Sequence, residues 1–217
     1  VPIVMVIAML LPFVLPSFSE TSSGPSFYEL AAVALFMGMG IFSLLISMTS
    51  IGQEGSAMWN IYSLPIDSRT LVRAKAAPVL LISIPASVAM TVLISLFGGF
   101  SANAFFAALI VAICLVIEES FVGVAVGTAF PDFSEVPRSR FVTVTGSILG
   151  MIVGAVAGLV ILSPLGIYTL LRQIFHLTLF TLPTALAATI ILTATLVYIS
   201  YRYAVSRAFK LLREAPT

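Results

Sequence analysis

Charged residues are scarce in this chain. Ten Lys and Arg and nine Asp and Glu make up 9% of its 217 residues, whereas 60% are hydrophobic; soluble domains carry about 25% charged residues. So few polar side chains cannot cover a water-soluble globule, which excludes a soluble enzyme. The net charge of +1 and the lack of a basic cluster on a hydrophilic face exclude nucleic acid as a partner.

Cysteine and histidine are nearly absent as well. The single Cys114 can form no disulfide within the chain. Together with the single His176 it is too little for a metal site of the Cys/His kind. We therefore expect no metal site and no cofactor in this chain.

Known catalytic patterns are missing too. The intramembrane metalloproteases that carry a Glu-Glu pair place an Arg four positions later, where this chain has Gly123. A Ser/His/Asp triad is excluded because His176 is predicted on the outer side of the membrane, and Asp67 and Asp132 on the inner side. No GxxxxGKS or GxxxxGKT loop occurs, so the chain cannot hydrolyse ATP alone. We expect no catalytic residue here.

Long apolar runs are what the chain does contain. Crossing the hydrocarbon layer takes about 20 mostly apolar residues in a helix. One shorter and five full-length runs fit this requirement, namely Val1–Pro16, Leu30–Ile51, Ala76–Phe97, Ala104–Phe130, Val142–Ser163 and Leu182–Tyr201. The prediction is an all-α polytopic membrane protein, a single transmembrane domain over residues 1–217 with six spans. Because the first run is short and begins without Met, we interpret Val1 as a fragment boundary.

The basic residues predict the orientation of these spans. Lys and Arg near span ends are retained on the cytoplasmic side. Nine of the ten fall on one side of the six-span topology: Arg69, Arg73, Lys75, Arg138, Arg140, Arg202, Arg207, Lys210 and Arg213. Only Arg172 falls on the other side, in a connection predicted over Pro164–Thr181 that is long enough for short re-entrant helices. Both termini are therefore predicted in the cytoplasm.

The cytoplasmic segment 52–75 is polar but amphipathic. Met58, Trp59 and Tyr62 share one side of a short helix, which would place the two aromatic rings at headgroup depth. Pro65 would end this helix, and Asp67 would cap the next one. An ordinary juxtamembrane loop with an aromatic anchor is the alternative interpretation.

Two acids lie inside the predicted span 104–130. A carboxylate in hydrocarbon costs a few kcal/mol, so Glu118 and Glu119 need a reason to be there. Adjacent residues diverge by about 100° around a helix, and only Glu119 shares its face with Gly123 and Gly127. Glu119 is either a hydrogen-bonded group at a helix contact or a carboxylate that lines a polar pathway or takes up protons.

Glycines recur every fourth residue in the next predicted span. They are Gly146, Gly150, Gly154 and Gly158. Four glycines on one side of a helix form a groove that admits the backbone of another helix. We predict close packing there against a neighbouring span or a second copy of the protein.

Two motifs carry a resemblance to a known family. The first is an acid-Gly pair, a short helix, Ser-Leu-Pro and a basic residue before the third span, formed by Glu54, Gly55, Trp59, Ser63, Leu64, Pro65, Arg69, Leu71 and Lys75. The second is the GTAFPDF turn at 127–133, which ends the fourth span. In these motifs and in its topology the chain resembles the permeases of the ABC type-2 exporter class.

The resemblance implies an architecture and partners. Two six-span units would face each other, the second being another permease half or an identical chain, so that this chain could be the C-terminal part of a longer permease. Separate ATP-binding subunits would hold ATP and Mg. The segment 54–64 would be a coupling helix, and the residues contacting the ATPase would be Glu54, Gly55, Trp59, Tyr62, Leu64, Pro65 and Arg69.

The expected function is that of a permease subunit of an ATP-driven exporter in a prokaryotic plasma membrane. It would move an unidentified substrate across the bilayer. Two alternatives from other classes stay open: an ion-coupled secondary transporter in which Glu118 or Glu119 carries protons, and a non-transporting membrane scaffold.

Overall fold

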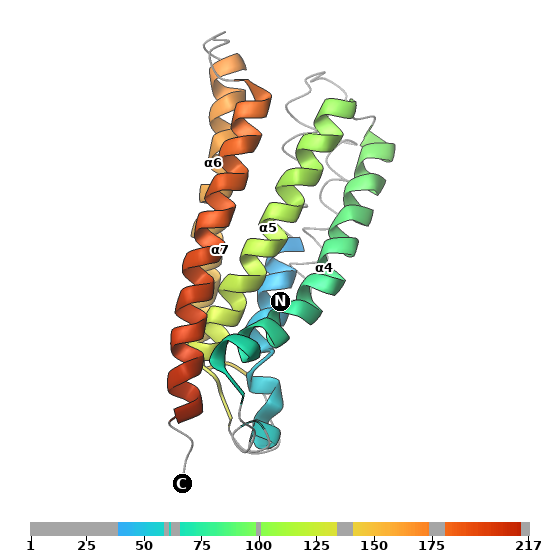
Figure 1. The fold of residues 1–217 in the computed structure, drawn as a ribbon. Coiled ribbons are helices and arrows are strands. Elements are labelled where there is room, and N and C mark those ends of the chain that lie inside the picture. The colour runs from blue at the N-terminus through green and yellow to red at the C-terminus, as the bar shows by residue number, and fades with distance from the viewer. Residues whose placement is uncertain are drawn as a thin grey trace.

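The computed structural model describes residues 39–58, 61, 66–98, 101–133, 141–173 and 181–213. Residues 39–49 are helical, and the elements that follow are the short helix η2 (Gly52–Ala57) and the long helices α4 (Ser68–Gly98), α5 (Ala102–Ala129), α6 (Val144–Gln173) and α7 (Leu182–Arg213) (Figure 1). Within these residues there is no strand, and one isolated bridge pairs Pro131 with Val142. The prediction of an all-helical protein is confirmed.

Four of these helices are long and apolar enough to cross a membrane: Ser68–Leu96, Ala102–Ala129, Val144–Leu171 and Leu182–Arg213. They correspond to the last four of the six predicted spans. The helical residues 39–49 fall in the second predicted span, whose beginning lies outside the described residues, as does the whole of the first. The protein is therefore an integral membrane protein with at least four spans.

Helix α5 lies at the centre of the bundle, between α4, α6 and α7 (Figure 1). Of its membrane-crossing window 72% is buried inside the protein, against 28%, 33% and 17% for α4, α6 and α7. Its core contacts include the Phe121 ring, which meets the Tyr201 ring of α7 edge to face at 6.2 Å between centroids. Most of the middle of α5, including Glu118 and Glu119, is therefore held within the protein interior.

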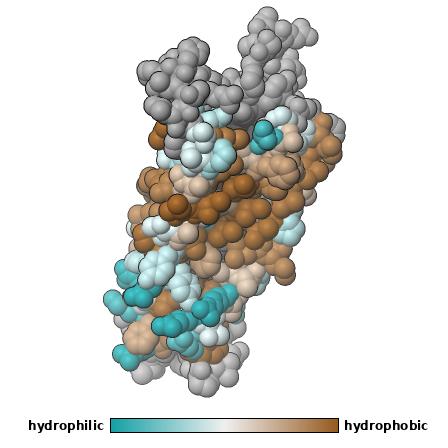
Figure 2. Space-filling view, turned by 45° about the horizontal axis from the view of Figure 1, so that its top comes forward, coloured by the Kyte–Doolittle hydropathy of each residue, from teal (hydrophilic) through white to brown (hydrophobic). Residues whose placement is uncertain are grey.

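The outer faces of the other helices are strongly apolar. Leu81 and Leu96 of α4 are 77% and 74% exposed, and Ile191 of α7 is 65% exposed. Hydrophobic residues cover the middle of the molecule, and hydrophilic ones gather toward its lower end (Figure 2). An exposed apolar surface of this kind suits contact with lipid, and helices suit a lipid environment because they satisfy their own backbone hydrogen bonds.

Helix α6 is longer than the sequence predicted. The expectation that the span ends at Ser163 and that Pro164 opens an outer connection is wrong for residues 164–173, which continue α6. Proline has no N–H to donate to the carbonyl four residues earlier. The Ser163 hydroxyl instead donates to that carbonyl, on Val160, at 2.8 Å. The rest of the predicted re-entrant segment, with His176, lies outside the described residues.

The hydrogen bond from Ser163 to the Val160 carbonyl is expected to stabilise the protein. Ser163→Ala should lower the free energy of unfolding by about 1 kcal/mol, because the Val160 carbonyl would face lipid unpaired. The measurement is thermal unfolding in detergent, with a downward shift of about 2–4 °C. The matched control is Thr195→Ala. Thr195 is also exposed and donates to Ile191 at 2.9 Å, but that carbonyl lies in an uninterrupted helix. Equal losses in both variants would contradict the interpretation.

Helix α4 also departs from its predicted limits. It begins at Ser68 rather than Ala76 and passes through Pro78 and Pro85. The added turns are held by tertiary packing, since the buried Leu71 and Val72 belong to a core cluster shared with α5 and α7. The basic residues before the predicted span therefore lie within the helix itself.

Candidate functional site

Glu119 lies where three helices meet. It projects from α5 and is only 4% exposed. A Cβ added at Gly154 of α6 would come 2.6 Å from Glu119 Oε2, one at Gly158 would come 3.4 Å from Oε1, and one at Gly40 would come 3.3 Å from Cγ. Glycine at these places thus makes room for the carboxyl group.

A cavity of about 210 Å³ adjoins this carboxyl group. Its lining comes from helix 39–49, α5 and α6, and consists of Gly40, Ile41, Leu44, Leu115, Glu119, Met151, Ala155 and Gly158. In the described part of the chain, Glu119 Oε2 has no hydrogen-bond partner. The cavity therefore has apolar walls and is bordered by one carboxyl group.

Glu118 is turned toward a different part of the bundle. It shares its face of α5 with Phe121 and Ala125, which pack in the core cluster formed with α4 and α7. Glu118 is 0% exposed, and neither of its carboxyl oxygens has a hydrogen-bond partner among the described residues. The two adjacent acids thus lie in separate surroundings.

Two buried hydroxyls of α4 lie near the depth of Glu118. Ser83 lies 15 residues before the end of α4 at Gly98, and Glu118 lies 16 residues after the start of α5 at Ala102. Both positions are about 23 Å along their helices from the short turn that joins them. Ser83 and Ser87 are fully buried, and in the described residues their hydroxyls also lack partners. Buried polar side chains of α4 and α5 thus form a polar layer at a similar depth inside the membrane-spanning region.

The predicted glycine faces lie against other parts of the same chain. A Cβ at Gly123 would come 2.6 Å from the Leu44 carbonyl oxygen and even closer to Ser47 Oγ, and one at Gly127 would overlap the Met48 carbonyl. On α6, Gly146 lies against Phe130 and Gly150 against Met48. The glycines of α5 thus lie against helix 39–49, and those of α6 lie against helix 39–49 and the residues of α5 and its C-cap. The sequence alone had left two partners possible, a neighbouring span or a second copy of the protein.

The described part of the predicted coupling segment is tied to two membrane helices. Glu54 of η2 forms an ion pair with Lys75 of α4. Gly52 of the same element packs so tightly on the Phe141 backbone that an added Cβ would overlap the carbonyl oxygen. Gly55 has φ 50°, a left-handed conformation that favours glycine. Element η2 therefore contacts both α4 and the connection into α6.

The remaining predicted coupling residues are only partly described. Arg69 is exposed on the first turn of α4. Trp59, Tyr62, Leu64 and Pro65 lie outside the described residues. The sequence named both members of the Glu54–Lys75 pair but did not predict their contact.

The GTAFPDF motif ends α5 and begins the connection to α6. Helix α5 ends at Ala129, and the amide of Asp132 then donates to the Phe141 carbonyl at 3.2 Å. The amide of Thr143 donates back to the Phe130 carbonyl at 3.1 Å. These two bonds place residue 141, and with it the contact to η2, at the ends of α5 and α6.

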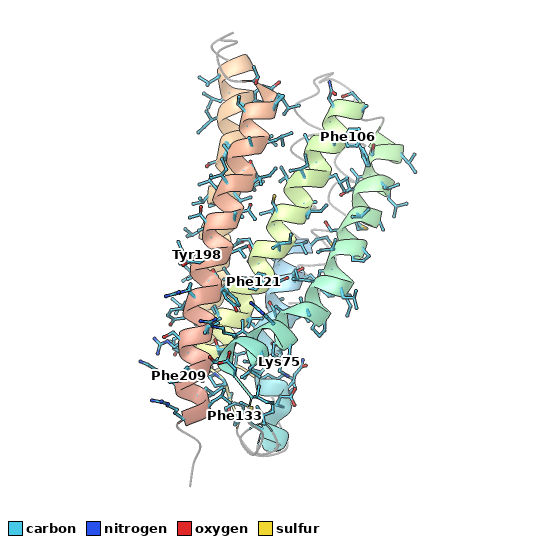
Figure 3. All side chains as sticks on the ribbon, in the orientation of Figure 1. Lys75, Phe106, Phe121, Phe133, Tyr198 and Phe209 are labelled. Atoms are coloured by element: carbon cyan, nitrogen blue, oxygen red, sulfur yellow. The ribbon has the colours of Figure 1, made fainter. Side chains whose placement is uncertain are left out.

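The end of the bundle where α4 begins and α7 ends is rich in basic and aromatic residues. The guanidinium of Arg73 lies 5.9 Å from the Tyr201 ring centroid, and that of Arg213 lies 4.2 Å from the Phe209 ring centroid. Lys75 and Phe209 both lie toward this end (Figure 3). Cation–π contacts of this kind suit a membrane–water interface. No group of three or more metal-ligating side chains occurs in the described residues.

A bundle of membrane-crossing helices with buried acids and a polar, basic end defines an integral membrane protein. Residues 6–214 match the family model described as "Putative ATP-binding cassette", and the chain belongs to this family. It is thereby related to the components of ABC transporters. No curated protein and no solved structure matches the chain.

Proposed function

We propose that this chain is the permease subunit of an ATP-driven exporter in the plasma membrane of a prokaryote. The observation that carries the proposal is a combination: a member of an ATP-binding cassette family has four membrane-crossing helices and no GxxxxGKS or GxxxxGKT loop within its 217 residues. A separate subunit then binds ATP and Mg, and this chain performs no catalysis.

The contacts of η2 support a mechanical role for this element. Glu54 of η2 forms an ion pair with Lys75 of α4, and Gly52 packs on Phe141 in the connection between α5 and α6. In the proposal these elements face the cytoplasm, as the positive residues at the same end favour. Closure of the ATPase would press on segment 52–65 and move the helices as rigid bodies, with a second permease half or an identical chain opposite.

The Glu54–Lys75 pair gives the test of this role. Lys75→Glu and Glu54→Lys should each reduce ATP hydrolysis by the purified complex about two- to fivefold, because a partly exposed ion pair contributes up to about 1 kcal/mol. The double variant, with the charges exchanged, should restore the rate. The measurement is ATP hydrolysis in vesicles that contain the chain and the proteins that co-purify with it.

Gln53→Ala is the matched control, since Gln53 neighbours Glu54 but its side chain donates to Thr49 Oγ1 at 3.1 Å, in the helix that precedes η2. It should leave the rate unchanged. Failure of the double variant to recover would contradict the role of the pair. The absence of any ATP-hydrolysing protein from the purified wild-type preparation would overturn the proposed function.

A further inference from the structure

The cavity beside Glu119 has a chemical character that neither helix packing nor the proposed coupling to an ATPase explains. Glycines at 40, 154 and 158 accommodate the carboxyl group, yet its Oε2 atom is left without a partner in the described residues. Close packing alone would be served equally well by an apolar side chain at this position. A carboxyl group that borders a cavity and has an unpaired oxygen indicates a ligand that donates a hydrogen bond to the group.

The lining of the cavity indicates the chemistry of that ligand. Apart from Glu119, the described residues that line it have apolar side chains or none, such as Ile41, Leu44 and Leu115. None of them carries a positive charge that could offset the carboxylate. The complementary ligand therefore has one cationic hydrogen-bond donor and an otherwise apolar body.

The volume of the cavity and its position further restrict the class of ligand. A cavity of about 150 Å³ is enough for benzene, and this one measures about 210 Å³. Two of its lining residues, Ile41 and Met151, are 37% and 45% exposed on the apolar outer face of the bundle. The cavity thus borders the apolar outer face of the bundle, from which a molecule dissolved in the bilayer would enter.

We propose that this cavity binds a small lipophilic ammonium ion, whose N–H donates to the Glu119 carboxylate and whose apolar body fills the space between helix 39–49 and α6. This inference rests on the proposed function in one respect, because it assigns the substrate class of the permease. The binding site itself is a property of this chain alone.

The test measures binding of 4-fluorobenzylammonium by fluorine NMR to the purified full chain in phosphatidylcholine nanodiscs. The neutral 4-fluorobenzyl alcohol, of nearly the same shape, reports partition into lipid and apolar contacts. We expect the chain to bind the ammonium ion at least tenfold more tightly than the alcohol. Equal binding of the two probes would overturn the proposal.

Three variants locate the site. Glu119→Gln should abolish the preference for the ammonium ion, whereas Glu118→Gln, the adjacent acid on the other face of α5, should leave it unchanged. Ala155→Leu narrows the cavity without touching the carboxyl group, and should weaken ammonium binding at least tenfold even if Glu119→Gln does not fold. Unchanged binding in Ala155→Leu, or an equal loss in the two glutamate variants, would overturn the site.

The result of the binding assay is independent of the test of the proposed function, because the assay contains the purified chain without an ATPase. Loss of the binding preference together with a co-purifying ATPase would overturn the site and leave the permease proposal intact. Selective ammonium binding without any ATPase partner would uphold the site and overturn the permease proposal.

Discussion

Gly123→Ala is expected to lower the free energy of unfolding by about 2–3 kcal/mol, the upper part of the range for overpacking a closely packed interior. The added methyl group would come 2.6 Å from the Leu44 carbonyl oxygen and overlap Ser47 Oγ. The oxygen of Leu44 belongs to the backbone of a helix and cannot rotate away. Helix 39–49 would therefore have to move off α5, which would also open the contact at Gly127.

The measurement is thermal unfolding of the purified protein in detergent, in which about 2–3 kcal/mol corresponds to a fall of roughly 4–12 °C. Gly166→Ala is the matched control, because a Cβ there would meet nothing within 4 Å. It lies in α6 and should be neutral or stabilising by up to about 1 kcal/mol through helix propensity. A loss at Gly166 as large as that at Gly123 would show that glycine matters for the backbone and not for the contact.

The glycine pattern shows how far sequence reasoning reaches. A period of four in α6 predicts a buried stripe, because residues four apart lie on one face whatever the partner is. The identity of the partner is a tertiary property. Only the structure shows that Met48 of helix 39–49 lies against Gly127 and Gly150, so that one helix lies against glycines of both α5 and α6.

Helix limits were the weaker part of the prediction. Hydropathy finds the apolar middle of a span, so the all-helical character and the last four membrane helices were predicted correctly. Hydropathy does not predict that the Ser163 hydroxyl replaces the hydrogen bond lost at Pro164. Nor does it predict that Leu71 and Val72, which precede the apolar run, pack in a core cluster with α5 and α7. Local rules for proline and polarity were overridden by a side-chain hydrogen bond in one case and by packing in the other.

The candidate site was predictable only in part. The difference of about 100° between neighbouring residues separates Glu118 from Glu119 without any structure. The cavity beside Glu119 could not be predicted, because it depends on how far helix 39–49 stands from α6. The ion pair of Glu54 with Lys75 joins residues 21 apart in the sequence, a tertiary contact that local patterns do not predict.

Glu118→Met is expected to raise the free energy of unfolding by about 1–3 kcal/mol. Glu118 is 0% exposed, and within the described residues neither carboxyl oxygen has a partner. Methionine has a similar volume and no desolvation cost. The expected rise in melting temperature is about 2–4 °C for each kcal/mol, measured by thermal unfolding in detergent. Glu54→Met, at a part-exposed site, is the control and should not stabilise.

Glu118→Met also shows whether Glu118 has a structural or a functional role. An unpaired polar group that lowers stability is retained where function needs it, so Glu118→Met should be more stable and less active in ATP-dependent turnover. A stabilised variant of full activity would mean that the carboxyl group has no part in the mechanism. Destabilisation by more than about 1 kcal/mol would instead reveal a hydrogen-bonded network, with water joining Glu118 to Ser83 and Ser87 in the polar layer. In that event, Ser83→Ala in the Glu118→Met background should cost less than in the wild type, because the network would already be broken.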